Sequence, residues 1–324
     1  MNIQSPTRPS LRSFWDATGM LLVFVLLFAG CALFVPNFSS WVNFKGLLLS
    51  VATVGLISCT MLFCLASGDF DLSVGSIVAM AGVLTAVVIN RTGSVPLGIA
   101  AGVASGALVG LVNGFVIARL GINALITTLA TMQIVRGLAY IISDGKAVGI
   151  NVPSFYSLGI NSFPANPSRF AVPIPIWIML ISFVIFGILL NKTIFGRNTL
   201  AVGGNAEASR LAGIRVAPLK IVIFTLQGAM AAFAGVILAA RFTSGQPTTA
   251  QGLELQVISA CVLGGVSLTG GTGTIIGVVV GVLIMGIVNN AMNLLQIEPF
   301  YQYLASGSIL LAAVLVDRLR TRTA

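Results

Sequence analysis

The sequence predicts an all-α polytopic membrane protein of about ten transmembrane helices. Hydrophobic residues occupy 57% of its 324 positions and charged residues only 8%, whereas soluble domains carry roughly 25% charged residues. Because so few charges cannot cover a surface that faces water, the solvent of this chain is expected to be lipid. In lipid only helices and closed barrels satisfy the backbone polar groups, and long apolar runs without alternation are typical of helices.

Ten apolar runs between charged or turn-rich breaks have about the length that crosses a bilayer, roughly 20 residues. Basic residues precede the first run, as in a signal peptide, but no small-x-small cleavage site follows it and nine further runs do. We therefore expect one membrane domain over residues 1–324, with spans near 19–35, 46–67, 73–90, 95–118, 122–142, 173–190, 219–240, 253–268, 273–292 and 300–316.

Lysine and arginine predict the orientation, because cytoplasmic loops carry an excess of them. If the N-terminus is cytoplasmic, the outer loops hold five of the 17 basic residues: Lys45, Arg91, Lys146, Arg169 and Arg241. The inner loops and tails then hold Arg8, Arg12, Arg119, Lys192, Arg197, Arg210, Arg215, Lys220, Arg318, Arg320 and Arg322. Both termini and the loop 191–218 are therefore predicted to be cytoplasmic. The other long loop, 143–172, lies outside and divides the helices five and five, as in transporters built from repeats.

Glycines at four-residue spacing mark one face of the fourth span: Gly98, Gly102, Gly106, Gly110 and Gly114. Residues i and i+4 share a helix face, and small residues let helix backbones approach closely in a membrane. Gly273, Gly277 and Gly281 repeat the pattern in the ninth span. The stripes predict tight packing within one subunit, with a dimer interface as the alternative.

Several classes of function are disfavoured. The chain has no histidine, which removes histidine-based acid–base catalysis and metal ligation. Its four cysteines lie inside apolar stretches without metal-ligand spacing, and the net charge of +9 sits in loops, which favours membrane orientation over nucleic-acid binding. No phosphate-binding G-x-x-x-x-G-K-[ST] sequence is present; Gly145-Lys146-Ala147 is the nearest approach. We expect no metal and no cofactor on this chain, and any ATPase on another polypeptide.

Two polar stretches interrupt the apolar pattern. GDFDLSVGS, Gly68–Ser76, places Asp69 and Asp71 between two spans, where carboxylates are costly unless they are solvated, capping or functional. Asp71 or Ser73 could cap the following helix, or the stretch could line a solute path. In the inner loop, Asn205 is a plausible N-cap and Gly213 a plausible stop for a short helix suited to a partner's groove. A merely solvated loop is the alternative.

Other polar residues lie within the predicted spans, mainly as amides: Asn113, Asn123, Gln133, Arg136, Gln227, Gln256, Asn289, Asn290 and Asn293. Amides both donate and accept hydrogen bonds, which suits a sugar better than an ion. They serve equally well to join helices. Arg136 is expected to face the bundle interior or a wet cavity. The candidates for a translocation pathway are Asp69, Asp71, Ser73, Asn123, Gln133, Arg136 and Gln256.

At these stretches the chain resembles a known family. GDFDLSVGS is similar to the GGIDLSVGS-type motif of bacterial ABC importer permeases for monosaccharides, and GGNAEASRLAGI resembles their GGNxEAARLxGI segment. The likeness runs over nearly the whole chain and is strongest to the L-arabinose permeases of that group, notably in MLFCLASGDFDLSV at 61–74, NALITTLATMQIVRGLAYIISDGKAVGI at 123–150, TSGQP at 243–247 and VISACVLGGVSL at 257–268. Asp69 departs from the common pattern, which leaves the role of the acidic stretch open, and Ser209 replaces a common alanine, which is a conservative change.

The resemblance implies the ABC importer permease fold and a bacterial inner-membrane protein that is not an enzyme. It implies a permease homodimer fed by a periplasmic sugar-binding protein and powered by a cytoplasmic ATP-binding subunit, which carries ATP and Mg. It also implies that the ATPase contacts Gly203, Gly204, Asn205, Glu207, Arg210, Leu211 and Gly213.

Three other classes remain as alternatives. A secondary sugar transporter driven by an ion gradient would need titratable groups in the membrane, and Asp69 and Asp71 are the only close candidates. A membrane enzyme is disfavoured because no nucleophile, base and orienting group occur together. A passive channel would work without an ATPase.

Overall fold

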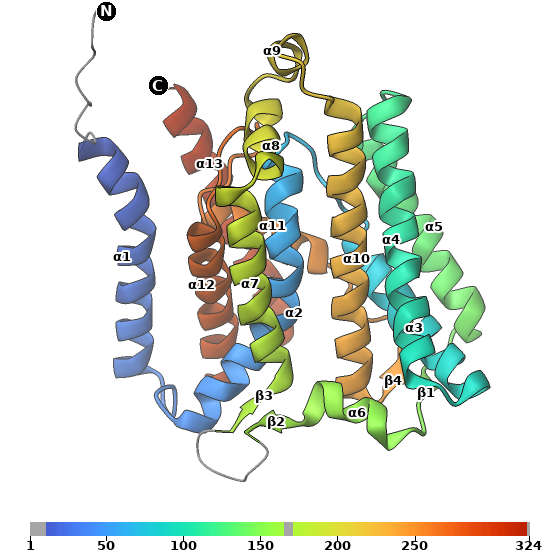
Figure 1. The fold of residues 1–324 in the computed structure, drawn as a ribbon. Helices are drawn as coiled ribbons and strands as arrows, with labels where there is room; N and C mark the ends of the chain where they lie inside the picture. Colours follow the sequence, from blue (N-terminus) through green and yellow to red (C-terminus); the bar gives the residue numbers. More distant parts are fainter. Residues whose placement is uncertain (1–10, 165–170, 323–324) are drawn as a thin grey trace, which may run out of the picture.

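The computed structural model describes residues 11–164 and 171–322 and is a bundle of helices (Figure 1). Arg8 and Arg169, on which the predicted orientation partly depends, lie outside the described residues. The elements in chain order are α1 (Leu11–Phe34), α2 (Trp41–Ala66), α3 (Val74–Thr92), α4 (Val95–Arg119), α5 (Ala124–Ser143), β1 (Val148–Gly149), α6 (Pro153–Ile160), β2 (Ser162–Phe163), β3 (Val172–Pro173), α7 (Ile174–Lys192), α8 (Ile194–Gly204), α9 (Ala206–Leu211), α10 (Val216–Phe242), β4 (Ser244–Gly245), α11 (Leu253–Leu263), α12 (Ile275–Leu294) and α13 (Pro299–Arg322).

Each of the ten predicted spans lies on a helix. Within the described part, seven helices are long and apolar enough to cross a membrane: α2, α3, α4, α5, α7, α10 and α12. Two shorter apolar helical segments, Gly19–Phe34 of α1 and Leu253–Leu263, correspond to the first and eighth predicted spans. The polytopic helical class is therefore confirmed, and ten is an approximate count of its crossings.

The predicted span 253–268 is too long, because α11 ends at Leu263. Gly264 and Gly265 end the helix: Gly265 has a φ of +82°, and the N–H groups of Gly265 and Val266 donate to the carbonyls of Val262 and Cys261. This is the hydrogen-bond pattern of a glycine C-cap. Apolar composition continues past the glycines, so hydropathy alone could not reveal the stop. The start of the ninth helix also moves, to Ile275, which leaves Gly273 in the preceding loop.

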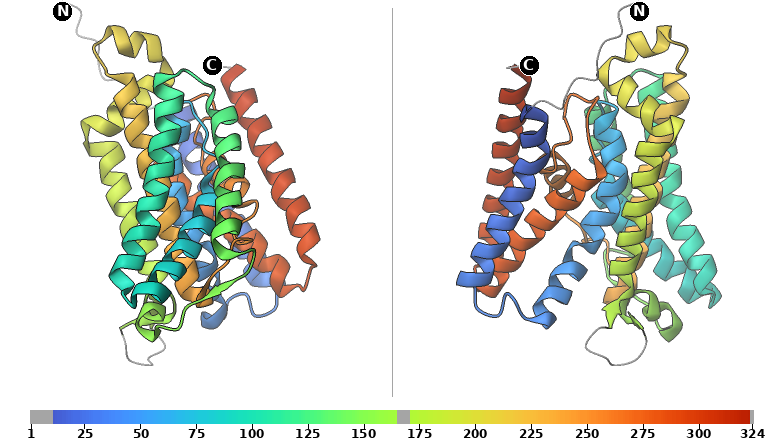
Figure 2. Two further views of the ribbon diagram at one scale, coloured as in Figure 1. Left: turned by 90° about the vertical axis from the view of Figure 1, so that its right-hand side faces the viewer. Right: turned by 60° about the vertical axis from the view of Figure 1, so that its left-hand side comes forward.

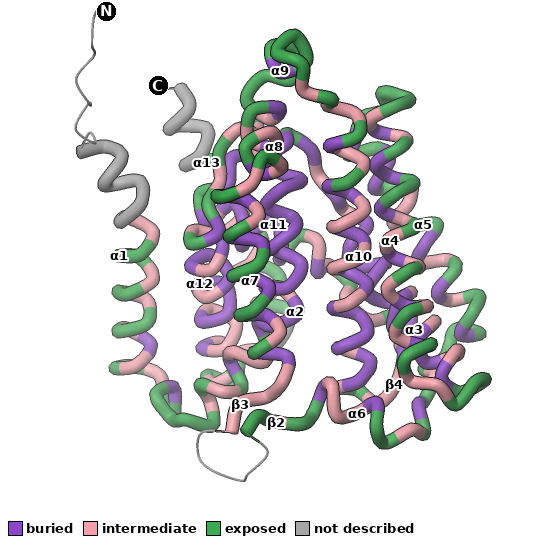
Figure 3. The backbone as a smooth tube through the Cα atoms, in the orientation of Figure 1, coloured by how far each residue is buried: buried purple, intermediate pink, exposed green. Residues whose placement is uncertain are grey.

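Helix α2 lies in the centre of the bundle, where Figure 3 shows most of its course as buried. Every residue from Gly55 to Ala66 is buried, in keeping with a helix that is apolar on all sides. Helices α3, α4 and α10 pack tightly against one another, and α10 connects this group to α2. The five glycines of α4 are buried and face side chains or backbone of α3 and α10, so these helices approach at backbone distance.

The two ends of the bundle differ. At one end β1 pairs with β4 and β2 pairs with β3, both antiparallel, so the loop 143–172 is tied to the end of α10 and the start of α7. At the other end, which also holds the start of α1 and the end of α13, α8 and α9 project from the bundle (Figures 1 and 2). The fold therefore presents a helical projection at one end only of the described chain.

Candidate functional site

The acidic stretch between α2 and α3 is a buried hydrogen-bond network. Asp71 is fully buried, and its Oδ1 accepts hydrogen bonds from the backbone N–H of Ser73, at 2.9 Å, and from the Ser73 hydroxyl. Asn113 of α4 donates to the Ser73 hydroxyl at 3.0 Å, and the hydroxyl of Thr131 on α5 donates to Asn113 Oδ1 at 2.7 Å. Ser73 occupies the N-cap position of α3, but its side chain makes no capping hydrogen bond. Asp71, rather than Ser73, therefore satisfies a backbone donor at this helix start.

Asp69 belongs to a separate contact. Its Oδ2 lies 2.7 Å from Nζ of Lys220 on α10, and the two side chains are 11% and 18% exposed. Because the pair is mostly removed from water, its two charges depend on each other. This ion pair joins the non-helical segment between α2 and α3 to the first turns of α10.

We expect Lys220→Met to destabilise the protein by roughly 3–5 kcal/mol, because it leaves the Asp69 carboxylate buried without a counter-charge. The Asp69→Asn, Lys220→Met double variant should recover a large part of that loss, because both charges are gone. Thermal unfolding of the purified wild type, both single variants and the double variant measures this coupling. Strictly additive losses would contradict it.

Arg136 anchors a non-helical segment to α5. Its Nη1 donates to the carbonyls of Pro247 and Thr249, both at 2.7 Å. These carbonyls belong to the stretch 246–252 that leads from β4 into α11. The partner of Arg136 is therefore backbone from a segment more than 100 residues away, which the sequence did not indicate.

The starts of α3 and α11 meet inside the bundle. A Cβ on Gly75, in the first turn of α3, would lie 2.5 Å from the carbonyl of Ala250 and from Oε2 of Glu254, in the first turn of α11. From this point the helices run toward opposite ends: α3 reaches β1 and β4, and the loop after α11 reaches the end of α8. Helices α3 and α11 each follow a non-helical stretch. Each is also the third predicted span in its half of the chain, counted from the N-terminus for α3 and from the long outer loop for α11. This correspondence, with the opposite directions, fits an inverted repeat.

Glu254 is a carboxylate that the sequence reasoning missed. Asp69 and Asp71 were expected to be the only acidic residues near the spans, and Glu254 is a third, half-buried in α11. The sequence contains a similarity that could have revealed Glu254: residues 71–76 read DLSVGS and residues 254–259 read ELQVIS, each beginning with an acidic residue and leucine. These two stretches open the two helices that meet at Gly75.

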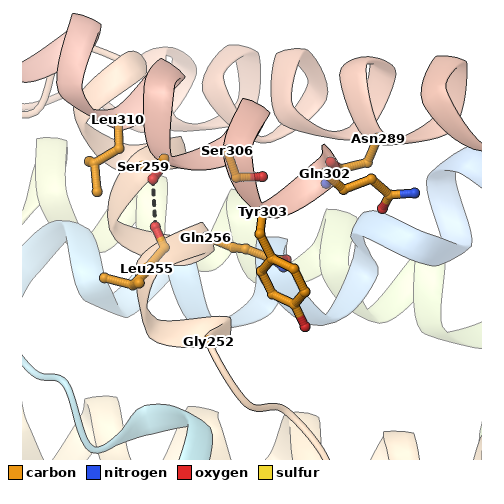
Figure 4. A pocket seen from close by; sticks show the side chains of 10 residues that line it. Gly252, Leu255, Gln256, Ser259, Asn289, Gln302, Tyr303, Ser306 and Leu310 are labelled. Atoms are coloured by element: carbon orange, nitrogen blue, oxygen red, sulfur yellow. Dashed lines mark hydrogen bonds between the residues drawn. The ribbon is translucent and has the colours of Figure 1, made fainter. Parts of the chain in front are cut away.

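Two cavities adjoin α11, each with amide or hydroxyl groups set in a lining that is otherwise apolar; we call them the polar cavities. One, of about 210 Å³, lies between α11, α12 and α13 and is lined among others by Gln256, Ser259, Asn289, Gln302, Tyr303 and Ser306 (Figure 4). The other, of about 350 Å³, lies between α2, α11 and α12. Gln256 and Asn289 line both cavities. Amide and hydroxyl groups thus gather beside α11.

The remaining pathway candidates lie apart from these cavities. Asn123 caps α5, accepting from the backbone N–H of Leu125 at 2.8 Å. Gln133 is exposed on α5. Asp69, Asp71, Ser73 and Arg136 are likewise absent from the lining of both cavities. Of the seven candidates, only Gln256 lies in the polar cavities.

The projecting segment α8–α9 is exposed at its tip and closely packed at its base. Asn205 caps α9 by accepting from the N–H of Ala208 at 2.8 Å, and Gly213, with a φ of +88°, ends it, as the sequence predicted. Leu211 is 83% exposed, and the surface pair Glu207–Arg210, at 3.4 Å, contributes little to stability. At the base, a Cβ on Gly203 would overlap the carbonyl of Ala66, at the end of α2.

The base of α8 also reaches the loop that follows α11. A Cβ on Gly203 would lie 2.6 Å from the backbone nitrogen of Gly271, whose N–H donates to the Ala66 carbonyl at 2.9 Å. A movement of α8–α9 would therefore act directly on the end of α2 and on the loop between α11 and α12.

A bundle of membrane-crossing helices with polar cavities between them and a helical projection at one end defines the membrane permease component of a transport system. The chain belongs to the family described as the branched-chain amino acid transport system / permease component, which it matches over residues 43–314. It is a transport component and not an enzyme.

Relatives within the family are named for sugars. The chain is 62% identical over 313 residues to the L-arabinose transport system permease protein AraH of Escherichia coli strain K12, covering 97% of this chain and 94% of that one. It is 56% identical to the L-arabinose ABC transporter permease protein AraH of Azospirillum brasilense, covering 94% and 88%. It is 41% identical to the ribose import permease protein RbsC of Bacillus subtilis, covering 87% of each. No solved structure gives a significant match.

Proposed function

We propose that this chain is the membrane permease of an ATP-driven importer that carries L-arabinose into the cell. The observation that carries the proposal is the 62% identity, over 97% of this chain, to a permease named for L-arabinose transport. The ribose permease is more distant, at 41%. The polar cavities beside α11 are lined in part by amides and hydroxyls, which match the neutral hydroxyl groups of a sugar.

The proposal includes its partners and orientation. A homodimer of this chain lies in the bacterial inner membrane, a periplasmic sugar-binding protein delivers the substrate, and a cytoplasmic ATP-binding subunit holds ATP and Mg. The distribution of lysine and arginine supports a cytoplasmic position for both termini. Because α8–α9 lies at the same end of the bundle as the start of α1 and the end of α13, it would face the ATPase (Figure 1).

The attachment of α8–α9 to the bundle provides a route that couples ATP hydrolysis to sugar transport. The permease does not hydrolyse ATP, so closure of the ATPase subunits has to move it mechanically. The exposed tip of α9, including Glu207, Arg210 and Leu211, provides a docking surface. Its base touches α2 and the loop 264–274 through Gly203, so displacement of α8 would tilt helices beside the cavities. Gly204, Asn205 and Gly213 shape the segment.

Uptake of labelled L-arabinose into proteoliposomes tests the function. The vesicles contain this permease with its ATP-binding subunit, and the binding protein and sugar are added on the periplasmic side. We expect uptake that requires ATP and survives collapse of proton and sodium gradients. Uptake that stops with the gradients but not with ATP depletion would instead identify the ion-coupled alternative.

We expect Glu207→Lys to leave membrane insertion intact and to lower association with the ATP-binding subunit at least about tenfold. The substitution reverses a charge in the proposed docking surface and places it beside Arg210. Co-purification of the ATP-binding subunit with the tagged permease measures this. Glu298→Lys is the matched control, because Glu298 is exposed in the turn between α12 and α13 at the opposite end. Unchanged co-purification of Glu207→Lys would refute the docking assignment.

A further inference from the structure

The amides around the two polar cavities divide into paired and unpaired groups. Asn43 and Asn290 exchange two hydrogen bonds, at 3.0 and 2.9 Å, and thereby join α2 to α12. Gln302 donates to Asn293 Oδ1 at 2.7 Å and joins α13 to α12. These side chains hold helices together.

Gln256 and Asn289 are different. Asn289 Oδ1 is buried and has no hydrogen-bond partner in the described part of the chain. The side-chain amide of Gln256 likewise makes no hydrogen bond to the described residues. A buried acceptor without a partner is costly, so Asn289 Oδ1 requires water or a ligand, and the half-buried amide of Gln256 is free to bind the same molecule. They are the two residues that line both cavities.

The lining excludes a charged occupant. Among the described residues, no aspartate, glutamate, lysine or arginine lines either cavity. An ion or a zwitterion there would lack a counter-charge, and burying an unpaired charge is strongly unfavourable. Amides and hydroxyls both donate and accept, as sugar hydroxyls do. Tyr303 and Ser306 add hydroxyl groups to the lining of the cavity between α11, α12 and α13 (Figure 4).

The two cavities together fall within the size range of small-molecule pockets, roughly 300–1,000 Å³. Their shared wall is made of side chains from α11 and α12. Helix α11 is followed by the loop whose Gly271 meets the base of α8. Movement of that loop would therefore alter the cavities.

We propose that Gln256 and Asn289 bind the transported sugar directly, at a position formed by the two cavities beside α11. The proposal rests on the proposed function and adds where in the chain the substrate is held. Contact at two amides is weak enough for the sugar to leave, as transport requires. The acidic network around Asp71 is then a structural element next to the path.

The test is uptake of labelled L-arabinose by proteoliposomes that contain the complete transporter. We expect Gln256→Leu to lower uptake at least about tenfold, because leucine cannot hydrogen-bond the sugar. Gln251→Leu is the matched control: Gln251 is exposed five residues earlier and lines neither cavity. It should retain uptake within about twofold.

Failure of the wild-type transporter to take up L-arabinose would refute the proposed function. Wild-type uptake by Gln256→Leu would refute only the present inference. If Gln256→Leu does not assemble into a complete transporter, the Ser306→Cys variant tests instead whether the sugar occupies the cavity. The four native cysteines are buried, so a small, neutral and hydrophilic methanethiosulfonate should modify the new thiol, and saturating L-arabinose should slow that modification at least about threefold. Equal rates with and without the sugar would overturn the inference.

Discussion

Replacing Gly106 by leucine is expected to abolish stable accumulation of the protein in the membrane. A Cβ at this position would overlap the Ala232 methyl group and the Gly228 carbonyl of α10, and would lie 2.8 Å from Ile77 of α3. These are backbone and short side-chain atoms, which cannot turn away. Leucine would force α4 away from α10 and remove the close packing that holds helices together in lipid. The amount of tagged protein in the membrane fraction measures the effect.

Ala104→Leu provides the control for that experiment. Ala104 lies on the same helix, two residues earlier, but its side chain is exposed. Leucine there adds apolar surface toward lipid without meeting another helix, so accumulation and transport should stay near wild type. Normal accumulation and transport of Gly106→Leu would show that the α4 glycine face is not a packing surface within the subunit.

The second large effect is expected at the base of the projecting segment. Gly203→Ala should destabilise the protein by roughly 3 kcal/mol or more, because the methyl group would overlap the Ala66 carbonyl and crowd the Gly271 backbone. The neighbouring helix end and loop are backbone, so relief requires α8 to separate from them. We also expect transport to fall at least about tenfold, because this contact links α8 to the membrane helices.

Gly204→Ala tests whether the lack of space around Gly203 causes the expected loss of stability. A Cβ on Gly204 has no neighbour closer than Gly271 Cα, at 4.0 Å. The same chemical change one residue later should therefore leave the melting temperature unchanged or slightly higher, since alanine restricts the unfolded chain. Equal losses of stability in both variants would indicate a general need for flexibility at the end of α8 and not a close contact.

The site was only partly predictable from sequence. The caps of α9 follow from local residue types, since Asn205 and Gly213 act within their own helix. Whether an intramembrane amide joins helices or remains free cannot be predicted locally. Asn290 pairs with Asn43, 247 residues away, whereas its neighbour Asn289 keeps an unpaired oxygen. The two residues have the same chemistry, and only the tertiary structure separates them.

The sequence by itself determined the membrane environment, the helical class and the approximate positions of the long helices. These depend on composition and on the need of each segment to satisfy its own backbone in lipid. The tertiary structure alone decided that the eighth predicted span is a short helix ending at Leu263 and that Glu254 meets the start of α3. It also decided that α8 rests on the end of α2. These features arise from contacts between distant segments, and hydropathy carries no information about which segments meet.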